Sequence, residues 1–187
     1  MTLRRTLPVL AALALAACAG SPGPAASLPP DAVMGAGDPL RSAITSTSLA
    51  FASPSRLAGR PAEAARAIAQ MEYLAVEIPG NPRLVGDSPT LDAQLRSARQ
   101  EWRAALGIPP EVPPQAVIDS LYAAARALGT GQPATAASVL PAVAFPGGGQ
   151  ATLARLGDLP PLPHTNAAAV AATETLRGQE GPTSGRL

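Results

Sequence analysis

The sequence predicts an all-α protein, a small alanine-rich bundle of about five helices between a disordered N-terminal tether and a disordered C-terminal tail. Apolar residues recur every three or four positions in several segments that begin near Pro, Ser or Asp and end near Gly. No segment shows a convincing alternation of apolar and polar residues, as a half-buried strand would. Because the 187 residues include only two Phe, two Tyr and one Trp, the core must consist mainly of Ala, Leu, Ile and Val.

The first two predicted helices have clear start signals. Asp38 suits an N-cap position and Pro39 the first helical position, and the segment ends near residues 53–54. The second helix begins at Pro61, carries apolar residues at helical spacing, and ends at residues 79–80, a Pro-Gly pair. These two segments are therefore expected to form neighbouring helices.

The third predicted helix has the most regular pattern. Ser88 is expected to cap it, Gly107 to end it, and its apolar stripe consists of Leu91, Leu95, Ala98 and Trp102. We expect Trp102 to anchor this helix in the core.

The remaining segments are shorter. A fourth helix is expected up to Gly129, and a fifth over residues 133–144, cut or kinked at Pro141. Residues 150–156 could add a short helical turn. Residues 166–177 could also be helical, but their alanine-rich face offers little to bury.

The N-terminal residues indicate export. Arg4 and Arg5 precede an uncharged, Ala/Leu-rich run over residues 7–17, and the only cysteine, Cys18, follows directly. A basic start, a short apolar run and small residues before a cleavage point define a secretory signal peptide. The run is too short for a transmembrane helix, which needs about 20 apolar residues. We expect residues 1–17 to be removed.

The segment Leu15-Ala16-Ala17-Cys18 resembles the lipobox of bacterial lipoproteins. The resemblance implies that Cys18 receives a diacylglycerol through a thioether, becomes the mature N-terminus and is often N-acylated, typically with palmitate. Ala19, in place of Asp, implies a lipid-anchored protein on the periplasmic side of the outer membrane, with the inner membrane as the alternative. An ordinary cleaved signal peptide is the alternative interpretation of the same residues.

This organisation divides the chain into four parts. A lipoprotein signal peptide over residues 1–17 precedes a flexible tether over residues 18–37. A helical domain is expected over residues 38–156, and a Pro/Ala-rich, largely disordered tail over residues 157–187.

Charge and residue types exclude several classes of function. Of 14 basic residues, all arginine, loss of Arg4 and Arg5 leaves 12 against 13 acidic residues, so no field that attracts nucleic acid is expected. His164 is the only histidine and Cys18 is assigned to the lipid. A metal site or a histidine-based triad therefore lacks residues, and no cofactor is expected.

Two patterns in the sequence are candidate catalytic sites. Gly86-Asp87-Ser88 is similar to the serine block of GDSL-type esterases, but Pro89 follows the serine, and helix capping explains the same residues. The carboxylates of Glu72, Glu77 and Glu101 could line a hydrolase cleft, although a solvated helix face is the favoured interpretation. The sequence therefore favours a protein that is not an enzyme.

One candidate interaction face lies on the third helix. Arg96, Arg99 and Arg103 are three to four residues apart and form a basic stripe beside Trp102. Such a stripe could contact an anionic glycan, a lipid headgroup or a carboxylate of a partner. A solvated helix face is the alternative.

Two segments share the pattern Gly-x-Pro-Ala-x-Ala-Ala, one starting at Gly59 and one at Gly131. The pattern resembles the turn and second helix of a tetratricopeptide hairpin. The copies are 72 residues apart, which is not a multiple of the usual repeat of about 34 residues. The alternative to a true repeat is that Gly-x-Pro-Ala is a favourable helix start that occurs twice in an alanine-rich sequence.

Together these features predict a lipid-anchored cell-envelope protein with a structural or protein-interaction role, held at the membrane through Cys18 and bound to an envelope protein whose identity the sequence does not give. The alternatives are a small-molecule or glycan-binding lipoprotein and, less in keeping with the residues, an envelope hydrolase.

Overall fold

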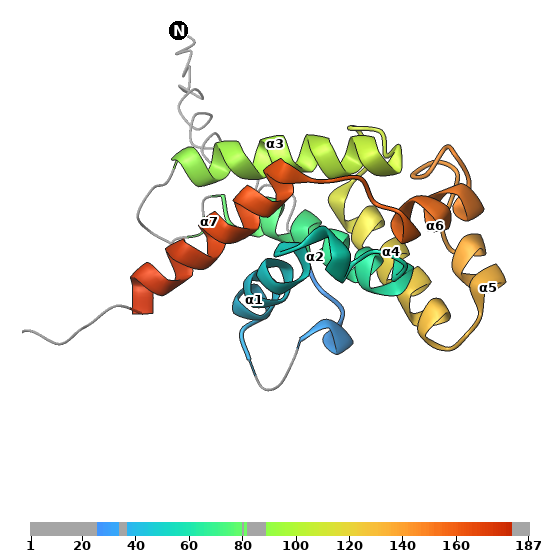
Figure 1. Ribbon diagram of the computed structural model, residues 1–187, viewed down its shortest axis with the longest axis horizontal. Coiled ribbons are helices and arrows are strands. Elements are labelled where there is room, and N and C mark those ends of the chain that lie inside the picture. Colours follow the sequence, from blue (N-terminus) through green and yellow to red (C-terminus); the bar gives the residue numbers. More distant parts are fainter. Residues whose placement is uncertain (1–25, 34–36, 80, 82–88, 181–187) are drawn as a thin grey trace, which may run out of the picture.

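The computed structural model describes residues 26–33, 37–79, 81 and 89–180 (Figure 1). The described residues form seven α-helices and no strand, so the predicted all-α class is confirmed. The helices are α1 (Pro39–Phe51), α2 (Pro61–Glu77), α3 (Pro89–Leu106), α4 (Pro114–Gly129), α5 (Pro133–Ser138), α6 (Gly149–Gly157) and α7 (Pro163–Glu180). Two short 3₁₀ turns, η1 (Pro30–Ala32) and η2 (Pro54–Arg56), lie before α1 and after it.

Proline and glycine set the helix boundaries. Six of the seven helices begin with proline, whose missing N–H costs nothing in the first turn of a helix. At α1, Asp38 acts as the predicted N-cap, and its carboxylate accepts a hydrogen bond of 2.9 Å from the Leu40 N–H. Gly107 follows α3 with φ of 71°, the left-handed conformation of a helix C-cap. The predicted cap Ser88 lies outside the described residues.

Helix α2 is the centre of the molecule and contacts α1, α3, α4 and α6. Every residue from 67 to 74 is buried, as expected for a helix surrounded by others. Helix α3 runs across the top of the view with α7 beside it, while α5 and α6 lie at the right-hand end (Figure 1). The largest fully buried side chains include Trp102, Tyr122 and Phe145, which supply bulk to a core otherwise rich in alanine.

The predicted fifth helix is shorter than expected. Helix α5 ends at Ser138, and residues 139–148 form turns. Pro141 disfavours helical geometry at the residue before it, and its own carbonyl accepts hydrogen bonds from the N–H groups of Ala144 and Phe145. This tight turn buries both of these side chains.

The expectation of a largely disordered tail over residues 157–187 is wrong for residues 163–180, which form α7. Ala168, Ala169 and Ala172 are buried against α3 and α1, because small side chains allow the helices to approach closely. Glu101 of α3 caps the start of α7. Its carboxylate accepts from the Thr165 N–H at 2.8 Å and from the Thr165 hydroxyl at 2.7 Å. Residues 181–187 lie outside the described part.

The expectation of a flexible tether over residues 18–37 is wrong for residues 26–33, which we call the N-terminal strap. The Ala26 N–H donates to Glu77 Oε1 at 2.8 Å, and the Ser27 N–H donates to Gln115 Oε1 at 2.9 Å. Further along, Asp31 forms a two-pronged ion pair with Arg126 of α4, with N–O distances of 2.7 and 2.8 Å. The strap is thus fastened to α2 and to both ends of α4.

None of the helices in the described ranges combines the length and the apolar character needed to span a bilayer. Cys18, the residue expected to carry a lipid, lies outside these ranges.

Candidate functional site

A buried charge cluster joins α2 to α3. Glu72 of α2 is completely buried, and its Oε2 accepts a hydrogen bond of 2.8 Å from the indole N–H of Trp102. Arg99 pairs with Glu72 Oε1 at 2.6 Å, and Arg103 contacts both carboxylate oxygens. A buried carboxylate with this many charge-assisted donors is held in one orientation.

Arg103 extends the cluster to the loop between α3 and α4. Besides Glu72, its guanidinium donates to the backbone carbonyls of Pro109, Pro110 and Val112 at 3.0–3.1 Å. The fixed fork of guanidinium donors suits this arrangement, in which one side chain bonds a carboxylate and three carbonyls. The cluster therefore connects α2, α3 and the loop that leads into α4. Its hydrogen bonds and ion pairs hold these elements together.

The three carboxylates considered for a hydrolase cleft are each engaged within the fold. Glu72 belongs to the buried cluster, Glu77 accepts from the N-terminal strap, and Glu101 caps α7. His164 is exposed, and its backbone N–H donates to Glu101 at 3.1 Å. No group of His, Cys, Asp and Glu in the described part of the chain is arranged to hold a metal ion. Gly86, Asp87 and Ser88 lie outside it.

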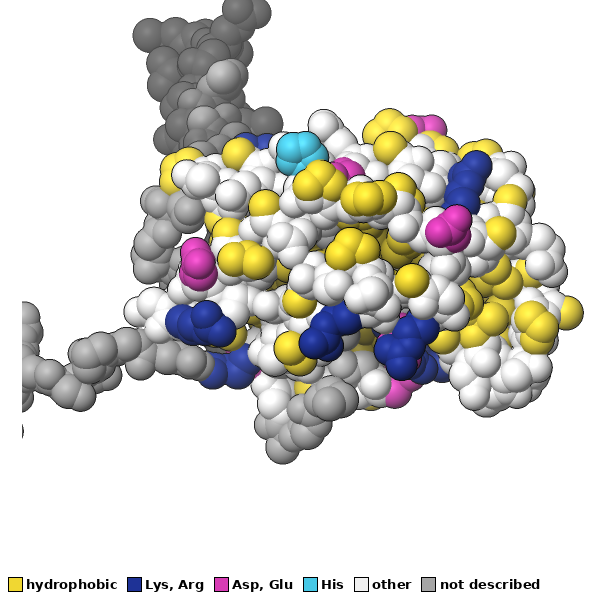
Figure 2. All heavy atoms as spheres, in the orientation of Figure 1, with side chains coloured by type: hydrophobic (Ala, Val, Ile, Leu, Met, Phe, Trp, Pro, Cys, Tyr) yellow, Lys and Arg dark blue, Asp and Glu magenta, His cyan; other side chains and the backbone are white. Residues whose placement is uncertain are grey.

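The predicted basic stripe on α3 is not a continuous exposed face. Arg103 is buried, and Arg99 is 29% exposed at its side chain and paired with Glu72. Arg96 alone of the three is exposed. On the face shown in Figure 2, the region of α3 along the top carries no continuous band of basic side chains.

The sequence does contain a signal for the buried cluster. Glu72 falls at a core position of the apolar repeat of α2, where a single acid is out of place unless it meets a cation. The only tryptophan, flanked by Arg99 and Arg103, supplies the complementary donors on α3. Spacing within one helix could not show that the two sets of side chains meet.

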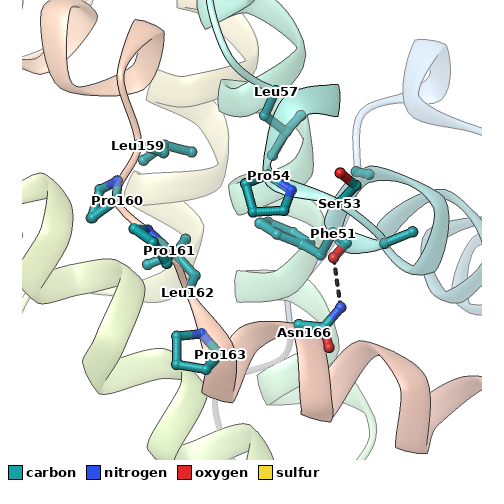
Figure 3. Close-up of a pocket in the computed structure, with 12 residues that line it drawn as sticks. Phe51, Ser53, Pro54, Leu57, Leu159, Pro160, Pro161, Leu162, Pro163 and Asn166 are labelled. Carbon is teal, nitrogen blue, oxygen red and sulfur yellow. Dashed lines mark hydrogen bonds between the residues drawn. The ribbon is translucent and has the colours of Figure 1, made fainter.

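A first cavity, which we call the proline groove, lies between the end of α1 and the segment that leads into α7 (Figure 3). It has a volume of about 360 Å³ and is lined by residues 50–54, Leu57, residues 159–163 and Asn166. Pro160 and Pro161 lie opposite Phe51 and Pro54 in the close-up.

The lining of the proline groove is almost entirely apolar. Pro54, Pro160, Pro161 and Pro163 have no N–H to donate, and Asn166 already donates to the Phe51 carbonyl at 2.6 Å. Within the described residues, no backbone hydrogen bond involves residues 159–161. The groove thus offers apolar surface and free carbonyl acceptors along one wall.

A second cavity, which we call the α1–α2 groove, has a volume of about 390 Å³. It lies along α1 and α2, with Tyr122 of α4 among its lining residues and the N-terminal strap at one side through Asp31 and Ala32. Arg56, Arg60, Glu63 and Arg66 line it together with apolar side chains of both helices. This groove combines charge, a buried hydroxyl and apolar surface.

Comparison of the chain with models of protein families, with curated proteins and with solved structures finds no match.

Proposed function

We propose that this chain is a lipid-anchored cell-envelope protein whose helical domain binds another envelope protein, and that it is not an enzyme. The lipobox-like segment ending in Cys18 supports the anchor, and its Ala19 favours the periplasmic side of the outer membrane. The observation that carries the binding role is the proline groove. Its walls come from segments more than 100 residues apart, so the groove depends on the folded domain.

The chemistry of the proline groove favours one kind of occupant, an extended apolar segment of a partner protein. Its volume of about 360 Å³ is at the lower end of the range for binding clefts. The carbonyls of residues 159–161 can accept hydrogen bonds from a partner backbone, and Phe51 and Leu57 can contact its apolar side chains. Rigid proline walls reduce the entropy lost on binding.

The resemblance to tetratricopeptide hairpins is part of the same proposal. Gly59 and Gly131 precede α2 and α5 with φ of 71° and 70°, so both copies of the shared pattern use one turn conformation. Helix α1 contacts α2, and α4 contacts α5, as in paired helices. Because α5 has six residues and α2 has seventeen, the similarity is greatest at the turns.

Site-specific photocrosslinking in intact cells tests the binding role. A photoreactive residue at position 160 is expected to give a discrete adduct, whereas one at Pro110, an exposed proline of the loop after α3, gives none. Pro161→Glu should abolish the adduct without changing the melting temperature. The crosslinked peptide, synthesised alone, should be apolar and bind the purified protein. Equal adducts at both positions, or none at 160, would contradict the proposal.

Intact mass of the membrane fraction tests the anchor. The proposal requires two or three acyl chains on Cys18 and loss of residues 1–17, and Cys18→Ser should leave the precursor unprocessed or release a soluble form. A mature protein without a lipid adduct would contradict the anchor and leave the binding test unaffected.

A further inference from the structure

Two arginines of the α1–α2 groove, Arg56 and Arg66, form no ion pair with a carboxylate of the described residues, and Asp31 offsets the charge of Arg66 only in part. Arg60 is paired with Glu63 at 2.9 Å, and Asp31 is paired with Arg126. No hydrogen bond or ion pair joins the guanidinium groups of Arg56 and Arg66 to another residue of the described chain. The groove therefore has an excess of positive charge on one rim.

A buried hydroxyl lies at the same groove. Tyr122 is 1% exposed, the Gln70 side chain lies at its Oη, and no acceptor takes the hydroxyl proton among the described residues. Burial raises the pKa of Tyr122 to about 12, so the hydroxyl keeps its proton at neutral pH and is available as a donor. A buried donor without an acceptor is unfavourable, and an acceptor from a ligand would relieve this cost.

Apart from Ser46 and Gln70, the remaining lining residues are apolar. Leu49 on α1 is 56% exposed at the rim, and Ala50, Leu57 and Ala67 line the walls. Gln70 lies beside the Tyr122 hydroxyl and also lines the groove. Polar and charged side chains therefore lie beside an apolar wall, a combination that is found in small-molecule sites.

We propose that the α1–α2 groove binds a small organic carboxylate, with the carboxylate at Arg56 and Arg66, the hydrocarbon portion against Leu49 and Ala67, and an oxygen that accepts from Tyr122. Two arginines partly offset by Asp31 and Glu63 suit a single negative charge better than a multiply charged phosphate. A volume of about 390 Å³ suits a molecule much smaller than a folded partner. This site adjoins the proline groove, with which it shares Ala50 and Leu57, but the carboxylate-binding proposal does not depend on the proposed function.

The test uses the mature chain with Cys18→Ser and follows backbone amide NMR signals during titration. The probes are hexanoate and 4-phenylbutyrate, with hexanamide and inorganic phosphate as controls. The carboxylates are expected to saturate with Kd below about 1 mM and to shift signals of α1 and α2. Hexanamide should bind at least about tenfold more weakly, because it lacks the charge that Arg56 and Arg66 recognise.

Matched variants separate a binding role from a structural one. Arg56→Gln and Arg66→Gln should each weaken hexanoate binding about five- to tenfold, whereas Arg96→Gln, on the exposed face of α3, should leave it unchanged. Tyr122→Phe keeps the ring in the core and should also weaken binding with the fold intact. The crosslink at position 160 should persist in all four variants.

Three results would overturn the inference. These are the absence of saturable carboxylate binding, equal binding of phosphate or hexanamide, and carboxylate affinity that Arg56→Gln and Arg66→Gln leave unaltered. Each can occur while the proline-groove crosslink forms, so failure here is distinguishable from failure of the proposed function.

Discussion

The indole N–H of Trp102 donates a hydrogen bond of 2.8 Å to Glu72, and both side chains are completely buried. The largest side chain of the core therefore also provides a hydrogen bond to the one fully buried carboxylate of the described residues, whose charge Arg99 and Arg103 balance. Core packing and ion pairing depend on each other at this contact between α2 and α3. Movement of either helix would open the core and would also separate Glu72 from its cationic partners.

Glu72→Gln tests this coupling. The substitution keeps the shape of the side chain and removes its charge, which leaves buried Arg103 without its ionic partner. We expect a loss of about 3–5 kcal/mol in the free energy of unfolding, measured by urea denaturation. Glu63→Gln, which breaks an exposed pair with Arg60, should cost no more than about 1 kcal/mol. Similar values for the two variants would show that the buried cluster is not structural.

Arg99 and Arg96 are equivalent in the sequence stripe but differ in the structure. Arg99→Ala removes a partner of the buried Glu72 and should destabilise the protein by about 1–2 kcal/mol, a value reduced because the arginine is partly exposed. Arg96→Ala, on the exposed face, should change stability by about 0.5 kcal/mol or less. The comparison uses the same denaturation assay, and equal losses would contradict the assignment.

Gly149 marks a close approach between α6 and α5. A Cβ at this position would overlap the backbone of Ala137, so Gly149→Ala should cost about 1–3 kcal/mol through displacement of one helix. At Gly147 a Cβ would meet the Arg155 side chain at 3.7 Å and Ala151 Cβ at 3.9 Å, both ordinary van der Waals contacts. The melting temperature of Gly147→Ala should therefore stay close to that of the parent. A parent-like Gly149→Ala variant would refute the close approach.

Helix α7 can be tested with two neighbouring alanines. Ala168 is completely buried, whereas Ala167 is exposed. Ala168→Arg should detach α7 from α3 and α1, because an unpaired charge cannot be accommodated there. Limited proteolysis should then cleave within residues 163–180, while Ala167→Arg resists cleavage like the parent. Equal protection of both variants would show that α7 is not packed as described.

The two tyrosines should titrate abnormally. Burial raises the pKa of both Tyr73 and Tyr122 to about 12 in the folded protein, from the ordinary tyrosine value of about 10. The unfolded chain loses its tyrosine protons first, so stability is constant below pH 10 and falls as the pH rises from about 10 to about 12. Tyrosinate absorbance should have its midpoint near 10 in denaturant and well above 10 in the native protein. A native midpoint near 10 would contradict the burial.

The helix boundaries were largely predictable because they depend on local chemistry. Pro61 and Gly107 act through a missing N–H and a positive φ, and neither effect depends on distant residues. The burial of Trp102 followed from its place on an apolar stripe. A helix over residues 166–177 was allowed by the sequence, but its packing was not predicted, because Ala168 and Ala169 bury little area each and their partners lie far away in the sequence.

The grooves and the buried cluster were harder to predict for the same reason. A helical pattern shows that Arg99 and Arg103 share a face, but it does not show that Glu72 lies opposite. Likewise, the sequence pattern predicts Tyr122 to be a core residue. Only the arrangement of α1, α2 and α4 in the folded protein places it at a groove with Arg56 and Arg66. The Cys18 assignment lies outside the described residues and stays a prediction.

The N-terminal strap sets how far the helical domain could stand from a membrane. With Ala26 fastened at Glu77 and Ser27 at Gln115, a lipid on Cys18 would be joined to the domain by eight peptide links, a reach of at most about 28 Å. The end of α2 and the start of α4 would then face the bilayer. A domain held by so short a tether would stay within a thin layer above the lipid. Its effective concentration for partners in the same membrane would therefore be raised.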